Sequence, residues 1–241
     1  MSLLRTILGN RALLHVELAW ATAALGNWTF SILLALYAYA EGGTSAVAVA
    51  LLVRMLPAGL AAPYAAMLAD RRSRRSVLLW SAALRAAALL GAAAAAAADA
   101  SLGVVLVFAT LFTVANTAHR PAQAALTPQL ARTPVELAAA NVCWSTLEYV
   151  GFLAGSLAAG LIASLLPLDV GFAACAAALA LTWLVLWPLP PDRRPAWIEE
   201  ESPGPVSELL AGRARSGRNR RSGCWSSSTG STRSRRGSST C

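Results

Sequence analysis

Residues 168–189 read LDVGFAACAAALALTWLVLWPL, an apolar run with one charged residue, Asp169. A helix needs about 20 predominantly apolar residues to cross a bilayer, and this run is long enough. Similar apolar blocks, separated by short polar segments, continue from about Leu13 to Leu189. With 56% hydrophobic and 13% charged residues, the chain is too apolar for an ordinary soluble domain. The sequence therefore predicts an all-α, polytopic membrane protein.

The apolar blocks predict a bundle of six transmembrane helices within residues 13–190. The expected helices cover residues 13–40, 44–69, 76–98, 101–126, 137–166 and 168–189. Because the connections between the blocks are short, we expect consecutive helices to be antiparallel neighbours. Six crossings place both ends of the chain on the same side of the membrane.

Except for Arg54 and Arg85, which fall inside the expected helices, the arginines before Pro191 gather at one end of the expected bundle. They are Arg5, Arg11, Arg71, Arg72, Arg74, Arg75, Arg120 and Arg132, followed by Arg193 and Arg194 after the last helix. The connections at the other end carry only Glu41, Asp99 and Asp169. Since loops rich in arginine remain in the cytoplasm, both termini, including residues 1–12, are predicted to be cytoplasmic, in a cell (inner) membrane.

The net charge of +8 belongs mostly to the tail, since the chain carries +3 up to Pro190 and +5 from Pro191 onward. We expect residues 191–215 to form a cytoplasmic linker. Residues 216–241 contain no Ala, Leu, Val, Ile or Met, and we expect an out-of-frame ending, with a disordered Arg/Ser-rich tail as the alternative. No nucleic-acid-binding motif accompanies the basic residues, so the expected partner is the lipid bilayer rather than a nucleic acid.

Neither a metal, a cofactor nor an enzymatic activity is expected. The four cysteines, Cys143, Cys175, Cys224 and Cys241, have no CxxC or metal-ligand spacing. A membrane protease would need a positioned nucleophile and base, yet the sequence has no GxSxG, no HExxH and no intramembrane pair of aspartates. A channel would need a filter segment, and none is recognisable.

Three charged residues, Arg54, Arg85 and Glu148, fall well inside the expected helices. Each costs a few kcal/mol there unless it faces protein or water, so they are the best candidates for a site. Glu148 is expected to face a central cavity, where it takes part in proton coupling or binds a cationic substrate. The alternative is a structural ion pair with Arg54 or Arg85. Glu17 and His119 are expected to be boundary residues near the membrane surface.

The connection between the second and third helices reads AMLADRRSRR, residues 66–75. It resembles the signature loop of the major facilitator superfamily, Gly-x-Leu-Ala-Asp-basic-x-Gly-basic-basic. The matching residues are Leu68, Ala69, Asp70, Arg71, Arg74 and Arg75, while Ala66 and Ser73 stand where glycines are usual. The resemblance implies that Asp70, Arg71, Arg74 and Arg75 form a conformational switch that latches one state and releases in another. The alternative is that the arginines only anchor the topology.

The fifth helix contains GFLAGSLAAG, residues 151–160. It is similar to the antiporter motif of the same family, Gly-x-x-x-Gly-Pro-x-x-Gly-Gly, with Gly151, Gly155 and Gly160 in place. Gly151 and Gly155 also form a small-xxx-small face that lets another helix approach closely. The resemblance implies that this face meets the other half of a transporter, and plain packing within the bundle is the alternative.

Further residues resemble the drug- and macrolide-exporting branch of the superfamily, among them Asn27, Arg54, Arg85 and Arg120. The match covers about residues 10–190, which corresponds to the amino-terminal six-helix half of the fold. The resemblance implies proton-coupled export of a small amphipathic substrate by alternating access, with Asn27 and Arg120 as further site candidates.

A truncated half is expected to work with its missing carboxy-terminal half or as a homodimer. The alternative is a membrane protein that does not transport, and that is either an inert truncation product or acts by pairing with itself or a partner.

Overall fold

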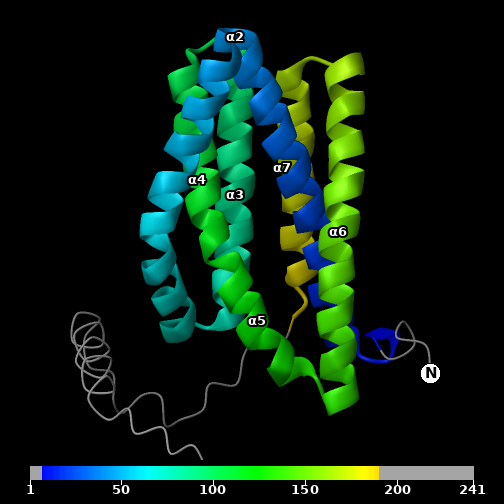
Figure 1. The fold of residues 1–241 in the computed structure, drawn as a ribbon. Helices are drawn as coiled ribbons and strands as arrows, with labels where there is room; N and C mark the ends of the chain where they lie inside the picture. Colours follow the sequence, from blue (N-terminus) through cyan, green and yellow to red (C-terminus); the bar gives the residue numbers. More distant parts are fainter. Residues whose placement is uncertain (1–6, 190–241) are drawn as a thin grey trace, which may run out of the picture. The chain divides into compact units, whose positions relative to one another are not determined.

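The computed structural model describes residues 7–189, except for the side chains of Ala66 and of residues 68–71. Within the described range the regular structure is entirely helical. The helices are α2 (Arg11–Arg71), α3 (Arg74–Ala97), α4 (Leu102–Thr117), α5 (His119–Leu130), α6 (Pro134–Leu165) and α7 (Leu168–Leu186) (Figure 1). The all-α class is confirmed. The expected linker, residues 191–215, and the tail, residues 216–241, lie outside the described residues.

Helix α2 bends sharply at two glycines. Gly42 has φ −156° and ψ 20°, and Gly43 has φ 67° and ψ −155°, a conformation that residues with a Cβ atom rarely adopt. The bend divides α2 into a first arm, residues 11–41, and a second arm, residues 44–71, which run in opposite directions (Figure 1). The bend falls where the sequence predicted the boundary between the helices 13–40 and 44–69.

Five described helical stretches are long and apolar enough to cross a membrane. They are Arg11–Ala65, Arg74–Ala97, Leu102–Leu130, Pro134–Leu165 and Leu168–Leu186. The first has 55 residues and contains the bend of α2, whereas a single crossing needs about 20. A polytopic membrane protein is therefore confirmed, and the bend leaves six helical rods in the bundle.

The expected helix 101–126 is interrupted, which corrects the prediction of a single continuous element. Helix α4 ends at Thr117, and α5 begins at His119. Pro121 has no N–H to donate to the carbonyl of Thr117, and its ring crowds that carbonyl. The interruption is slight, since Ala118 keeps φ −80° and ψ −20°. Its effect is to redirect the end of the rod that carries His119 and Arg120.

Small residues bring the helices close together. Gly91 in α3 lies directly against the ring of Phe108 in α4, so that a Cβ atom at Gly91 would overlap the ring. Most of the buried residues of α3 are alanines. Small side chains of this kind allow helices to approach closely. In the same core, the ring of Phe30 lies 4.7 Å from that of Phe112 and 5.7 Å from that of Phe172, measured between centroids.

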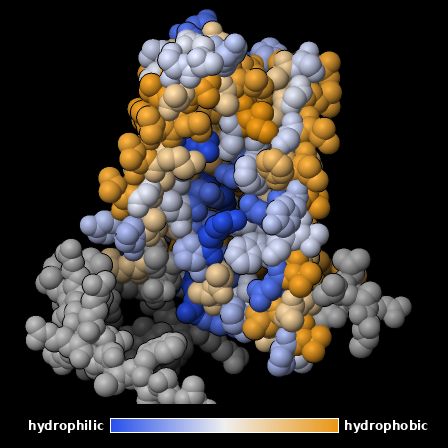
Figure 2. Space-filling model, in the orientation of Figure 1, coloured by the Kyte–Doolittle hydropathy of each residue, from blue (hydrophilic) through white to orange (hydrophobic). Residues whose placement is uncertain are grey.

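The outward faces of the bundle are apolar. Large exposed side chains on α6 include Leu153, Leu157 and Leu161, and the second arm of α2 exposes Leu52, Leu56 and Leu60. Orange, hydrophobic residues cover much of the upper flanks in Figure 2. In water such surfaces would aggregate, whereas a bilayer solvates them.

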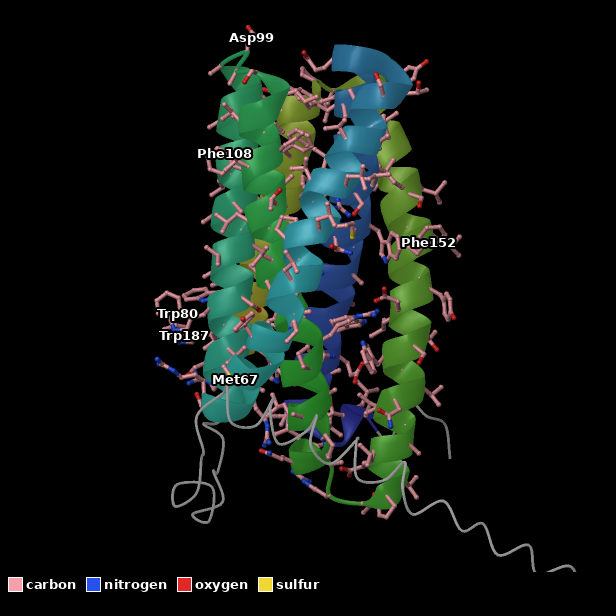
Figure 3. The ribbon with its side chains drawn as sticks, turned by 60° about the vertical axis from the view of Figure 1, so that its left-hand side comes forward. Met67, Trp80, Asp99, Phe108, Phe152 and Trp187 are labelled. Carbon is pink, nitrogen blue, oxygen red and sulfur yellow. The ribbon has the colours of Figure 1, made fainter. Side chains whose placement is uncertain are left out.

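The connections at the two ends of the bundle are short. Asp99, between α3 and α4, lies at one end, and Met67, near the end of α2, lies at the other (Figure 3). The bend of α2, next to Glu41, lies at the same end of the bundle as the connection between α3 and α4 (Figure 1). The acidic connections and the arginine-rich connections are therefore at opposite ends, as the alternation of apolar blocks predicted.

Candidate functional site

A cavity of about 240 Å³ lies between the first arm of α2, α3, α4, α5 and α6. It is lined by Trp20, Ala23, Ala24, Asn27, Trp28, Arg85, Asn116, Arg120 and Glu148. Figure 2 shows a blue, hydrophilic hollow in the middle of the face between orange flanks. Four of the residues predicted from sequence, Asn27, Arg85, Arg120 and Glu148, are thus brought together.

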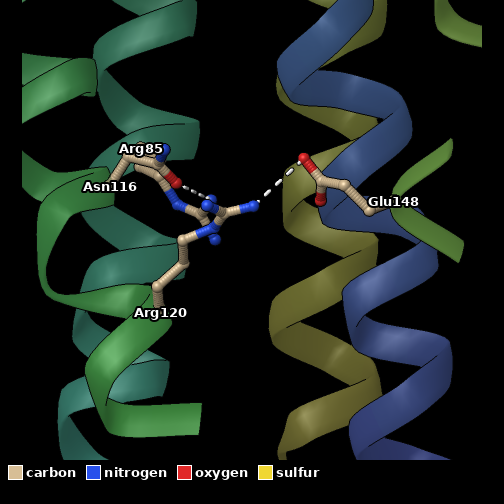
Figure 4. Close-up of polar contacts among 4 residues, drawn as sticks. All are labelled: Arg85, Asn116, Arg120 and Glu148. Atoms are coloured by element: carbon tan, nitrogen blue, oxygen red, sulfur yellow. Dashed lines mark hydrogen bonds and ion pairs between the residues drawn. The ribbon is translucent and has the colours of Figure 1, made fainter. Parts of the chain in front are cut away.

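An ion pair crosses this cavity. Nη2 of Arg120, in α5, lies 3.2 Å from Oε1 of Glu148, in α6 (Figure 4). The Arg120 guanidinium also lies over the ring of Trp20, 5.6 Å from its centroid. The sequence alternative had Glu148 paired with Arg54 or Arg85, and the structure corrects the partner to Arg120. The pair links two helices that otherwise touch little.

Arg85 is almost completely buried, with 1% of its surface exposed. Its guanidinium donates from Nη1 to Oδ1 of Asn116 at 2.8 Å and from Nε to the carbonyl of Ser81 at 3.3 Å (Figure 4). Nη2 lies 3.2 Å from Nδ1 of His119. Among the described side chains, no carboxylate is within ion-pair distance of Arg85, so this cation is held by neutral groups.

His119 is a core residue, which corrects its assignment to the membrane boundary. It is 1% exposed and stacks on the ring of Trp20, with centroids 5.7 Å apart and planes 16° apart. Because Nδ1 accepts from Arg85, the neutral ring carries its proton on Nε2. His119 thereby fixes the guanidinium of Arg85 and the indole of Trp20 together.

Glu17 is also buried, at 3% exposure, although the sequence placed it near the surface. Neither carboxylate oxygen has a nitrogen or oxygen hydrogen-bond partner among the described residues, and the thiol of Cys143 in α6 lies beside it. Glu17, Trp20 and Ala24 recur at helical spacing and so share one face of the first arm. That spacing relative to Trp20 was the signal that could have identified Glu17 as an inward residue.

Arg54 does not line the cavity. It is 8% exposed, its Nη2 donates to Oγ of Ser31 at 3.3 Å, and its guanidinium lies 5.9 Å from the centroid of the Phe30 ring. Both contacts belong to the first arm of α2, whereas Arg54 is in the second. The side chain joins the two arms.

The glycines of α6 differ in their surroundings. A Cβ atom at Gly151 would lie 2.7 Å from Cβ of Ala24, and one at Gly155 would lie 2.8 Å from Cβ of Trp28, whereas Gly160 has nothing within 4 Å. Gly151 and Gly155 therefore pack against the first arm of α2. The expectation that this face meets a second half of a transporter is wrong for these two glycines.

The arginine-rich connection is described only in part. The backbone of Asp70 and Arg71 completes α2, but their side chains lie outside the described residues. Arg74 begins α3, and Nη2 of Arg75 donates to the carbonyl of Trp187, just after α7, at 2.7 Å. This bond ties the beginning of α3 to the end of α7, close to the labelled Trp80 and Trp187 in Figure 3.

No group of three or more potential metal ligands occurs among residues 7–189 that the structure describes. Residues 18–230 match the family described as the Major Facilitator Superfamily. The matched range contains all the residues that line the cavity, and it extends into the segment predicted to be out of frame. No curated protein matches the chain.

Proposed function

The chain belongs to the Major Facilitator Superfamily of membrane transporters, and from this premise we propose that it exports small amphipathic compounds by alternating access coupled to protons. The observation that carries the proposal is the Arg120–Glu148 ion pair, which spans the cavity between α5 and α6. The Arg120 side chain is 59% exposed and that of Glu148 24% exposed, so the pair faces the open cavity, and charged residues in membrane-spanning segments that face a cavity often mark a substrate or ion pathway.

In this proposal Glu148 is the proton-coupling group. With the proton absent, its carboxylate holds Arg120 and draws α6 toward α5. A proton on Glu148 removes the charge of the carboxylate, and the attraction to Arg120 is then lost. The pair thus has two states of different energy, as a two-state switch requires.

We propose that Asp70, Arg71, Arg74 and Arg75 latch one conformation at the arginine-rich end. The hydrogen bond from Arg75 to the carbonyl of Trp187 supports a coupling between this end of α3 and α7. Charge-assisted hydrogen bonds of this kind are strong when made and specific in geometry.

The proposal also covers the membrane in which the protein lies and the branch of the superfamily to which it belongs. The concentration of arginines at one end supports an inner-membrane protein with both termini in the cytoplasm. The resemblance of Asn27, Arg54, Arg85 and Arg120 to the drug- and macrolide-exporting branch supports the outward direction.

Alternating access needs two six-helix repeats. We propose that the second repeat is a second copy of this chain or a separate carboxy-terminal half, so that a truncated half is active only when paired. The halves of this superfamily are related by an axis along the membrane normal, which permits two parallel copies.

The test uses the full chain in proteoliposomes and two permanently charged amphipathic probes, naphthalene-1-sulfonate and (1-naphthylmethyl)trimethylammonium. A pH gradient should accelerate the movement of at least one probe relative to empty liposomes. Glu148→Gln should abolish this dependence on the gradient, whereas Glu41→Gln, an exposed acid beside the bend of α2, should retain it. Movement no faster than in empty liposomes would overturn transport by this chain paired with itself, and gradient-driven movement by Glu148→Gln would overturn the role of Glu148.

A second candidate is a non-transporting membrane protein that acts by pairing. The exposed leucines of α6 and the open surface at Gly160 favour it, because they leave a long apolar face without a protein neighbour among the described residues. Cross-linked dimers without movement of either probe would support this candidate over transport.

A further inference from the structure

The cavity carries an unbalanced positive charge. Its lining contains two guanidinium groups, Arg85 and Arg120, and one carboxylate, Glu148. Glu148 is paired with Arg120, which leaves Arg85 as the excess charge. Arg54 is also cationic, but it lies outside the lining. A buried charge without a counterion is expensive, and a ligand of opposite charge lowers that cost.

The hydrogen bonds of Arg85 leave part of its guanidinium free. A guanidinium has five N–H groups, and Arg85 uses Nε and one hydrogen each of Nη1 and Nη2 for Ser81, Asn116 and His119. One N–H on each terminal nitrogen has no hydrogen-bond partner among the described residues. The planar guanidinium suits an oxyanion such as a carboxylate or a sulfonate better than it suits an uncharged acceptor.

The rest of the lining also offers more donors than acceptors. The indole Nε1 atoms of Trp20 and Trp28 are buried and have no hydrogen-bond partner among the described residues. An indole can only donate. Among the acceptors in the wall, Asn116 Oδ1 accepts from Arg85 and Oε1 of Glu148 is paired with Arg120, while the amide of Asn27 offers an acceptor as well as a donor.

The size and the walls of the cavity limit the ligand. Its volume is about 240 Å³, and the partly exposed ring of Trp28 supplies an apolar surface, whereas Trp20 is 5% exposed and its ring already contacts His119 and Arg120. Aromatic side chains stack with flat ligands. A cation, by contrast, would meet Arg85 and would have to displace Arg120 from Glu148.

We infer that the cavity binds small aromatic anions, and that Arg85 holds their oxyanion group while Trp28 contacts the ring. The inference rests on the proposed function, because it names the substrate class of the same cavity. Arg120 is a second cation, and it becomes available to the anion when its ion pair with Glu148 breaks.

The test measures binding rather than transport, by equilibrium dialysis of the purified full chain in detergent, with protein-free micelles as the blank. The probes are naphthalene-1-sulfonate, the uncharged naphthalene-1-sulfonamide and (1-naphthylmethyl)trimethylammonium. The wild-type chain should bind the sulfonate at least tenfold more tightly than either of the others. Equal binding of the three probes, or tighter binding of the cation, would overturn the inference without any variant.

Two substitutions locate the site. Arg85→Gln should weaken sulfonate binding at least tenfold, and Arg85→Lys should recover part of the loss because the charge is kept. Glu148→Gln should tighten sulfonate binding several-fold, because Arg120 is released, whereas a cation site at Glu148 would lose affinity. Unchanged sulfonate binding by a folded Arg85→Gln chain, or weaker binding by Glu148→Gln, would contradict the inference.

The two proposals fail in different ways. Selective sulfonate binding without transport would overturn the proposed function and leave the anion site standing. Gradient-driven movement of the trimethylammonium probe, together with its tighter binding, would support transport and overturn the anion site.

Discussion

At the scale of one residue, Glu17 is a polar group that is buried without a strong hydrogen-bond partner. Its carboxylate is enclosed between the first arm of α2 and α6, yet it lacks a nitrogen or oxygen partner among the described residues. The neighbouring thiol of Cys143 is only a weak donor, and a buried polar group without a good hydrogen bond costs about 1–3 kcal/mol. Replacing it with Met, which has a similar length and no charge, should therefore raise the midpoint temperature of unfolding in detergent. A fall in the midpoint would mean that the carboxylate is bonded.

Glu136 provides the opposite case for comparison. Its Oε2 accepts from Nδ2 of Asn10 at 2.9 Å and from the backbone N–H of Arg132 at 2.8 Å. Glu136→Gln should lower the same midpoint temperature, because an amide oxygen accepts these bonds more weakly than a carboxylate does. If Glu17→Met and Glu136→Gln shifted the midpoint in the same direction, hydrogen bonding would not be what distinguishes the two carboxylates.

Sequence reasoning identified the charged residues of the site but not their partners. Arg85 and Glu148 stand out because each interrupts a long apolar run, where a charge is costly. The pairing of Glu148 with Arg120 instead of Arg85 depends on how far α5 turns after the interruption near Pro121. One residue along a helix rotates a side chain by about 100°, so an uncertainty of one or two residues changes the partner. The burial of His119 was not predicted for the same reason, because the direction of its side chain also depends on the rotation of α5.

At the scale of the element, the contact between α6 and the first arm of α2 depends on glycines, which have no side chain to hold the two helices apart. Gly155 approaches Cβ of Trp28 and the backbone nitrogen of Thr29, which would lie 2.8 and 3.0 Å from an added Cβ atom. Gly155→Ala should destabilise the fold by about 1–3 kcal/mol, because backbone atoms must move apart. Gly160→Ala should be neutral or stabilising, since nothing lies within 4 Å. Reversible unfolding in mixed micelles measures both, and equal effects would refute the close contact.

The bend of α2 makes a second prediction for an element. Gly43 has φ 67° and ψ −155°, which is almost exclusive to glycine, so Gly43→Ala should cost about 1–3 kcal/mol of folding free energy. Gly59, in the second arm, has nothing within 4 Å, and Gly59→Ala should gain about 0.5–1 kcal/mol through helix propensity. The same unfolding measurement compares them. A stabilising Gly43→Ala would mean that the backbone at the bend differs from the one described.

The rods themselves were predictable because apolar length alone determines which segments can cross a bilayer. The boundary at 40–44 followed from Gly42 and Gly43, which interrupt the apolar run beside Glu41. The division between α4 and α5 did not follow, since Pro121 is tolerated within the first turn of a helix as well as at a break. Close packing by Gly151 and Gly155 was predicted, but the identity of the neighbouring helix was not, because a small-xxx-small face does not specify its partner.

At the scale of the whole molecule, the two ends of the bundle differ in charge, and this predicts its orientation. Ser101, between α3 and α4, is exposed, and so is Arg132, between α5 and α6. Ser101→Cys should react with a membrane-impermeant maleimide in intact cells, whereas Arg132→Cys should react only after the cells are opened. The unsubstituted chain, with its own cysteines, gives the background. Labelling of Arg132→Cys in intact cells would reverse the assigned orientation.

The bend at Gly42 and Gly43 also bears on how the chain enters a membrane. The two arms of α2 form one helical hairpin, and Arg54, in the second arm, finds Ser31 and the ring of Phe30 in the first. The second arm therefore does not have to carry the Arg54 guanidinium into the bilayer without polar or aromatic contacts during biogenesis. The hairpin contains both the costly guanidinium and the groups that solvate it, so the two arms are best suited to leave the translocation machinery together, before any later helix has been made.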